Sequence, residues 1–317
     1  MQMITTTAPD VVAARGRVGA RLVGRERELD LVLAAVAAGR DIVLEGPPGT
    51  SKTTMLTAIT GEWGIPLLFV EGNADLTPAK LVGHHNPARV LKEDYSEDNF
   101  VPGPLTEAMR QGGFLYIEEF NRAPDDTLNT LLTAMADRRL SIPRVGTVRA
   151  QPTFRIIASM NPYDNVGTTR LSSSVHDRLC RLAVDYQDEA AEQGIVALRT
   201  ELPPGGDSLG ASLLRDAVAL TRATREHPDV RQGSSVRGAI DLALVAVQLG
   251  ALRGLAVPDE VTRASTDPYA VLVLDAMLVA LSGRIHLDEA ADTTPERILT
   301  EIWEDRFILR PSAAQPG

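Results

Sequence analysis

Residues 45–54, with the sequence EGPPGTSKTT, constrain the fold more than any other part of the chain. An apolar run, Ile42-Val43-Leu44, precedes this segment, and a helix-forming stretch that begins at Met55 follows it. A glycine-rich loop between a buried strand and a helix presents backbone N–H groups and a helix dipole to phosphate oxygens. We therefore expect a phosphate cradle formed by Gly46, Pro47, Pro48, Gly49, Thr50, Ser51, Lys52, Thr53 and Thr54.

Two side chains of this loop have expected roles, and one departs from the usual pattern. In G-x-x-x-x-G-K-[ST], the lysine reaches the β- and γ-phosphates and the hydroxyl binds Mg²⁺, which assigns these roles to Lys52 and Thr53. Ser51 stands where the pattern has its second glycine. Because a Cβ restricts the backbone, Ser51 fits only if its dihedral angles stay in an allowed region.

Two further apolar runs end in polar side chains suited to phosphate chemistry. Residues 114–117 lead to Glu118 and Glu119. We expect Glu118 to contact Mg²⁺ through water and Glu119 to orient or deprotonate the attacking water. A pair of surface charges is the alternative interpretation. Residues 154–160 lead to Asn161, whose amide could hold the attacking water or the γ-phosphate.

The order of predicted elements indicates an α/β fold with a second, helical part. Strands are expected at 42–45, 67–70, 114–118, 154–159 and 181–184, with helices at 52–60, 77–82, 104–111 and 125–137 between them. Such alternation predicts a parallel sheet covered by helices on both faces. The pattern then becomes helical, with segments near 188–199, 211–226, 235–250, 268–281 and 295–303. We expect a flexible segment at 1–20, a nucleotide-binding core at 21–186, a helical lid domain at 187–310 and a tail at 311–317.

Composition narrows the class of protein. The formal net charge of −10 makes nucleic acid an unlikely partner. The N-terminus lacks the charged and apolar regions of a secretory signal, and charged residues interrupt the most apolar stretches, so we expect no membrane span and a cytoplasmic protein. A single cysteine, Cys180, allows no internal disulfide and is expected to be a small buried apolar residue.

Over most of residues 22–257 the chain resembles the MoxR family of AAA+ ATPases. The resemblance rests on motifs that occur in the family's order: Glu119-Phe120-Asn121-Arg122-Ala123-Pro124, Leu131-Leu132-Thr133-Ala134-Met135, Asn161-Pro162, Gly167-Thr168, Asp177-Arg178 and Gly233-x-Ser235-x-Arg237. It implies an AAA+ P-loop core, a parallel sheet between helices, followed by a small all-α lid.

The resemblance also implies a role for each motif. Gly46 to Thr53 would be Walker A, Glu118 and Glu119 Walker B with Glu119 catalytic, and Asn161 sensor 1. Arg178 resembles an arginine finger that acts on a neighbouring subunit, Arg237 resembles sensor 2, and Val23-Gly24 resembles the segment that contacts adenine. The family's Walker B residue is usually aspartate, so Glu118 is a second departure beside Ser51.

These roles predict an ATPase that uses ATP and Mg²⁺ and assembles into a ring, a hexamer by resemblance. By resemblance its client carries a von Willebrand factor A domain, and remodelling would assist metal or cofactor insertion. Two alternatives stay open: an ATP-dependent assembly scaffold with little hydrolysis, and a DNA-linked motor.

Two other segments are candidates for partner contact. Residues 84–100, which include His84, His85, Lys92 and Tyr95, lie where the family carries an insertion and could line a central pore. The two histidines are either a metal site or polar loop residues. Residues 138–149 predict a hairpin whose arginines are either solvated or face a substrate.

Overall fold

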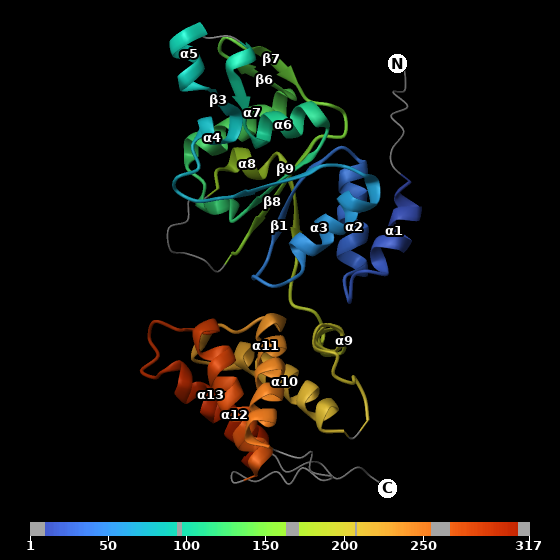
Figure 1. Ribbon diagram of the computed structural model, residues 1–317, viewed down its shortest axis with the longest axis vertical. Helices are drawn as coiled ribbons and strands as arrows, with labels where there is room; N and C mark the ends of the chain where they lie inside the picture. Colours follow the sequence, from blue (N-terminus) through green and yellow to red (C-terminus); the bar gives the residue numbers. More distant parts are fainter. Residues whose placement is uncertain (1–9, 94–96, 163–170, 207, 255–266, 310–317) are drawn as a thin grey trace. The chain divides into compact units, whose positions relative to one another are not determined.

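The computed structural model describes residues 10–93, 97–162, 171–206, 208–254 and 267–309 (Figure 1). Several residues singled out in the sequence lie outside this description: Gly167-Thr168, Tyr95, the side chain of Lys92 and the tail at 311–317. The chain divides into two compact units, Met1–Asp185 and Tyr186–Gly317.

The first unit is built on the predicted parallel sheet. Its five strands lie in the order β2-β5-β8-β1-β9, so β8 separates the cradle strand β1 from the carboxylate strand β5. Every pair of neighbours in this sheet is parallel. The strands are β1 (Asp41–Glu45), β2 (Leu67–Glu71), β5 (Phe114–Glu118), β8 (Arg155–Met160) and β9 (Leu179–Ala183).

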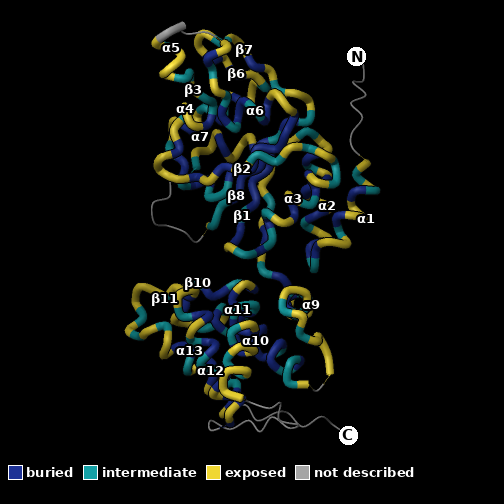
Figure 2. The backbone as a smooth tube through the Cα atoms, viewed as in Figure 1, coloured by how far each residue is buried: buried dark blue, intermediate teal, exposed yellow. Residues whose placement is uncertain are grey.

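Apolar residues cover both faces of the sheet because successive side chains of a strand point to opposite sides. On one face Ile42 and Tyr116 pack in the cluster that includes residues of α1, α2 and α3, and on the other Val43 and Ile117 pack with residues of α6 and α7 (Figure 2). The helices of this unit are α1 (Val11–Gly19), α2 (Glu26–Ala37), α3 (Lys52–Trp63), α4 (Pro78–Val82), α5 (Pro87–Glu93), α6 (Pro104–Gln111), α7 (Asp125–Asp137) and α8 (Ser173–His176), with 3-10 turns η1 (Glu97–Asn99) and η2 (Phe120–Arg122).

Two segments differ from expectation. Residues 11–19, expected to be flexible, form α1, since Asp10 caps the helix and Ala14 and Val18 are buried. Between the helices expected at 77–82 and 104–111, where the sequence predicted no strand, the chain contains a two-stranded ribbon of β3 (Gly83–His85) and β4 (Phe100–Pro102) around α5. The predicted hairpin is present as β6 (Arg139–Ile142) and β7 (Gly146–Arg149).

The second unit is mainly helical, as the sequence predicts. Its core includes fully buried Leu242, Val273 and Ile298, which come from three different helices. The elements are α9 (Glu189–Thr200), α10 (Leu209–Glu226), β10 (Val230–Gln232), α11 (Val236–Arg253), α12 (Pro268–Leu281), η3 (Ser282–Arg284), β11 (His286–Leu287), α13 (Pro295–Glu304) and the π-helical turn η4 (Asp305–Leu309).

Two other expectations concern the burial of Cys180 and the presence of membrane-spanning helices. Cys180 is exposed on β9, and the expectation of a buried residue was wrong because β9 is an edge strand. Among the described helices, none has both the length and the apolar character that crossing a bilayer requires.

Candidate active site

The loop between β1 and α3 encloses the Lys52 side chain. Lys52 Nζ donates to Gly46 O at 2.9 Å and to Pro47 O at 2.8 Å, and lies 3.2 Å from Thr50 Oγ1. These three oxygens are neutral, so they solvate the ammonium group without cancelling its charge. A buried cation inside a glycine-rich loop fits a phosphate ligand.

Ser51 begins α3 from a left-handed backbone conformation, with φ 64° and ψ 16°. This region is small but allowed for residues with a Cβ, which explains how serine replaces glycine here. The Ser51 side chain makes no capping bond to α3. The first N–H groups of a helix have no acceptor within the helix itself, and at this end of α3 they suit an anion bound in the cradle.

Gly46, the first glycine of the cradle, lies in close contact with the ends of two neighbouring strands. Its N–H donates to Met160 O at 3.0 Å, and a Cβ at this position would lie 1.9 Å from Val184 O. Only glycine permits this approach. The ends of β8 and β9 thus meet the loop that follows β1.

Thr53 and Glu118 lie together at the predicted metal position. Thr53 Oγ1 is 3.5 Å from Glu118 Oε1, and it is 3.3 Å from the hydroxyl of Tyr116, which in turn is 3.0 Å from Ser159 Oγ. Burial raises the pKa of Tyr116, so its hydroxyl keeps its proton. A hydroxyl and a carboxylate are the hard oxygen ligands that Mg²⁺ prefers, so these residues fit the ion.

Glu119 combines an unusual backbone with an ion pair. Its φ of 53° and ψ of 41° place a residue with a Cβ in the left-handed region. Its Oε2 lies 2.7 Å from Arg122 Nη1, and both side chains are 38% exposed. Strained backbone held by its surroundings is common at functional sites.

Gly72 lies directly against the backbone of Glu118 and Glu119. The Gly72 N–H donates to Glu118 O at 2.7 Å. A Cβ on Gly72 would lie 2.3 Å from Glu119 O, which is closer than atoms can approach. The strand end of β2 therefore limits the backbone position of the predicted catalytic residue.

Asn161 follows β8 directly, between the other two motifs. β8 pairs with β1 up to Glu45 and Met160, and with β5 up to Ile117 and Ala158. The carboxyl ends of these parallel strands meet at one edge of the sheet, which is where α/β proteins bind ligands. The structure thus brings Asn161 to the same edge as Lys52 and Glu118.

Val23 and Gly24 directly precede Arg25, and Arg25 contacts the chain near this edge of the sheet. Arg25 is buried, donates to Asp185 O at 2.6 Å and forms an ion pair with Glu28 at 3.1 Å. Asp185 follows Val184, the residue in contact with Gly46. Contact of Val23 and Gly24 with a base stays a prediction.

Arg178 lies at the other end of the sheet. It precedes Leu179, which pairs with Asp41 at the start of β1, whereas the cradle follows Glu45 at the end. With a rise of about 3.3 Å per residue, the two ends of β1 are ~13 Å apart. The exposed Arg178 side chain donates to Ser174 O at 2.9 Å.

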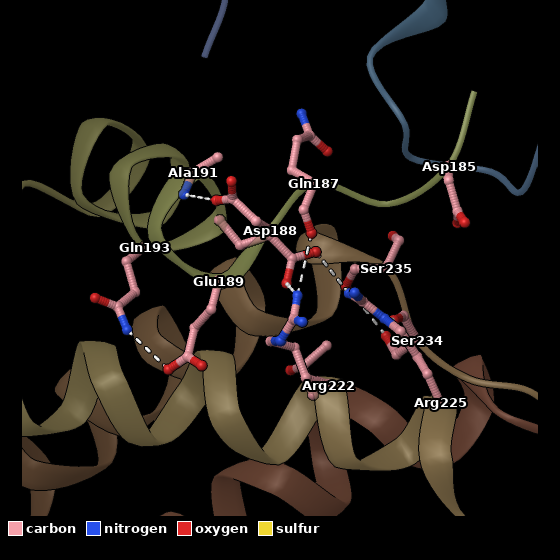
Figure 3. Close-up of polar contacts among 12 residues, drawn as sticks. Asp185, Gln187, Asp188, Glu189, Ala191, Gln193, Arg222, Arg225, Ser234 and Ser235 are labelled. Atoms are coloured by element: carbon pink, nitrogen blue, oxygen red, sulfur yellow. Dashed lines mark hydrogen bonds and ion pairs between the residues drawn. The ribbon is translucent and has the colours of Figure 1, made fainter. Parts of the chain in front are cut away.

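Arg237 is exposed near the start of α11 in the second unit. An ion-pair cluster around buried Glu192 contacts the loop before it: Arg225 donates to Ser234 O at 2.6 Å and pairs with Glu192 at 2.8 Å. Arg222 contacts Glu192 at 3.1 Å as well. Figure 3 shows Arg222 and Arg225 reaching from one helix toward the segment that contains Gln187 and Asp188. The role of Arg237 at the cradle stays a prediction.

Sequence reasoning missed four residues of this site. Tyr116 and Ser159 each lie two positions before a predicted site residue, Glu118 or Asn161, and the strand period of two could have indicated a shared face. No sequence signal distinguishes Gly72 from other turn glycines, and Arg122 lies within the family motif that begins at Glu119 but was given no role of its own.

The sheet, the loop and the converging strand ends define a P-loop nucleotide-binding protein. Residues 41–179 match the family model described as "AAA domain (dynein-related subfamily)". Gas vesicle ATPase GvpN of Ancylobacter aquaticus is 30% identical over 270 residues, which cover 78% of this chain and 71% of that protein. Denitrification regulatory protein NirQ of Stutzerimonas stutzeri is 32% identical, with 63% of this chain and 69% of that protein covered.

Solved structures agree on the fold. A mutant of Thermotoga maritima RuvB matches with a TM-score of 0.52 at 18% sequence identity, covering 81% of this chain and 70% of that one. The chain belongs to the AAA+ ATPases.

Proposed function

We propose that this chain is a MoxR-type ATPase that hydrolyses ATP between the subunits of a six-membered ring and uses the cycle to remodel a partner protein in the cytoplasm. The observation that carries the proposal is the meeting of three strand ends around one loop. There Thr53 lies 3.5 Å from Glu118, beside the enclosed Lys52.

Each residue has a defined task in this proposal. Lys52, the loop N–H groups and α3 bind the phosphates, and Thr53 and Glu118 hold Mg²⁺, directly or through water. The bound ion would neutralise charge on the phosphates. Glu119 accepts a proton from the attacking water, for which it must leave Arg122, and Asn161 orients that water or the γ-phosphate.

The position of Arg178 supports a site shared between subunits. Because Leu179 is in register with Asp41, the arginine lies at the sheet end opposite its own cradle. A finger supplied by a neighbour would stabilise the transition state, an effect of about 10³ to 10⁵ in phosphoryl transfer. Arg237 would act as sensor 2 within the lid.

The identity of the client is proposed from the resemblance to the MoxR family. The two relatives are named for gas vesicles and for denitrification, and these names do not indicate one shared substrate. We propose a client with a von Willebrand factor A domain, remodelled so that an enzyme acquires its metal or cofactor.

The proposal is tested by separating nucleotide binding from hydrolysis. Lys52→Ala should abolish ATP binding measured by calorimetry, and Glu119→Gln should bind ATP yet release no phosphate. A wild-type chain that binds ATP without turnover would favour an assembly scaffold instead. Stimulation of turnover by DNA at low salt would favour a DNA-linked motor.

A further inference from the structure

The hairpin β6–β7 borders an open groove on the first unit that the proposed ATPase site does not use. The groove has a volume of about 720 Å³ and is lined by α4, the ribbon strand β3, α7 and the hairpin. All four residues of β6 line it, and none of β7 does. Figure 1 shows these elements gathered in one region of the unit.

The edge of β6 that faces away from β7 has backbone groups available for pairing. Ala150 N–H donates to Arg138 O at 2.9 Å, which makes these two a hydrogen-bonded pair. Such pairs alternate along an antiparallel ladder, so Leu140 and Ile142 bond to β7. Arg139 and Ser141 therefore direct their N–H and C=O groups to the opposite edge, where no strand of the described chain pairs with them.

The side chains of β6 alternate between a buried face and an exposed face. Leu140 and Ile142 are buried below the hairpin, whereas Arg139 and Ser141 are exposed. An extended chain added beside β6 would thus find backbone partners and an apolar floor. Exposed strand edges of this kind are the sites of β-strand addition.

The charge of the hairpin indicates what kind of chain fits. Residues 138–149 contain four arginines and no carboxylate, in a protein whose formal net charge is −10. Arg138 is engaged by buried Asp41 at 3.1 Å, but Arg139, Arg144 and Arg149 are exposed. Arg139 has one acidic neighbour, Asp137 at 3.7 Å, and both are more than half exposed, so this pair is weak.

We propose that β6 binds an extended acidic segment of a partner protein as an added strand. Backbone bonds to Arg139 and Ser141 would fix the segment, and its acidic side chains would face the exposed arginines. Nucleic acid is the less suitable occupant, because phosphates do not pair with a strand edge and the chain is acidic overall. This binding requires neither nucleotide nor a ring, so it can succeed or fail independently of the proposed ATPase.

The test uses a labelled ten-residue peptide of alternating glutamate and threonine, with fluorescence anisotropy on the full chain without nucleotide. Ser141→Pro removes an outward N–H and should weaken binding about tenfold or more. Thr147→Pro is the matched control, since Thr147 is the cross-strand neighbour of Ser141 and directs its N–H to the far edge of β7. It should change affinity by less than about twofold.

Two further measurements do not depend on whether the proline variants fold. N-methylation of alternate amides in the peptide should abolish binding, because it removes the donors of one edge. Arg144→Glu should weaken the acidic peptide about two- to fivefold and favour a matched lysine peptide. Equal effects of the two proline variants, full binding of the methylated peptide, or displacement of the peptide by an equimolar single-stranded oligonucleotide would each overturn the proposal.

Discussion

At the residue scale, the site contains two non-glycine residues in the left-handed backbone region, Ser51 and Glu119. Each costs about 1 to 2 kcal/mol relative to a residue in a common conformation. Ser51 lies at the entry to α3 and Glu119 directly after β5. Backbone strain therefore occurs at two places in the proposed site: at Ser51 in the phosphate cradle and at Glu119, which would act on the attacking water.

Replacing Ser51 by glycine should relieve one of these strains. We expect Ser51→Gly to raise the free energy of unfolding by about 1 kcal/mol, measured by urea denaturation. Gly49→Ser, at φ 77°, is the reciprocal change and should lower it. A loss of stability in Ser51→Gly would show that the serine side chain contributes more than its backbone costs.

Gly72 should control hydrolysis without touching nucleotide. In Gly72→Ala the new Cβ must displace the backbone of Glu119, and misplacing a catalytic group by about 1 Å costs on the order of 10²-fold in rate. We expect kcat to fall by that order while ATP affinity is retained. Gly61→Ala, where a Cβ meets open space, is the matched control. Comparable rates in the two variants would contradict this role.

The strand, loop and helix that contain Lys52 could be predicted, because their glycine and lysine spacing is typical of phosphate-binding loops. Tyr116 and Gly72 could not, since their importance comes from neighbours distant in sequence: Thr53 for the tyrosine and the Glu119 carbonyl for the glycine. The conformation of Ser51 also needed the structure, because sequence alone gives only the range of allowed dihedral angles.

At the element scale, apolar runs predicted the strands of the sheet well. The runs at 114–118 and 155–160 are buried on both faces of the sheet, and short continuous apolar runs of this kind are typical of central parallel strands. The order of the strands was not predictable, because it depends on how the crossover helices pack. The short ribbon β3–β4 was missed since three-residue strands carry too little pattern to recognise.

The ion-pair cluster of Glu192, Arg222 and Arg225 should be far more important for stability than a surface ion pair. Arg225→Ala leaves the buried Glu192 carboxylate with one arginine instead of two, and should cost about 3 kcal/mol in urea unfolding. Arg253→Ala removes a pair to Asp275 in which both side chains are about 40% exposed. It should cost less than about 1 kcal/mol. Similar losses in both variants would contradict the assigned importance of the cluster.

At the scale of the whole molecule, one subunit lacks a complete reaction centre in this account. Lys52, Glu118 and Asn161 converge at one end of the sheet, and Arg178 lies at the other. Sequence resemblance assigned a role to Arg178, and the strand register adds that this residue lies at the sheet end opposite its own cradle. Turnover should therefore rise with protein concentration as subunits assemble.

The most direct test of this central claim is phosphate release from mixtures of two inactive variants. Arg178→Ala keeps the water-activating residue and Glu119→Gln keeps the arginine, so each alone should bind ATP and turn over poorly. When the two are mixed so that rings exchange subunits, some interfaces combine an intact Glu119 with an intact Arg178, and we predict that activity returns in proportion to those interfaces. Absence of any recovery in rings shown by mass measurement to contain both variants would contradict the account.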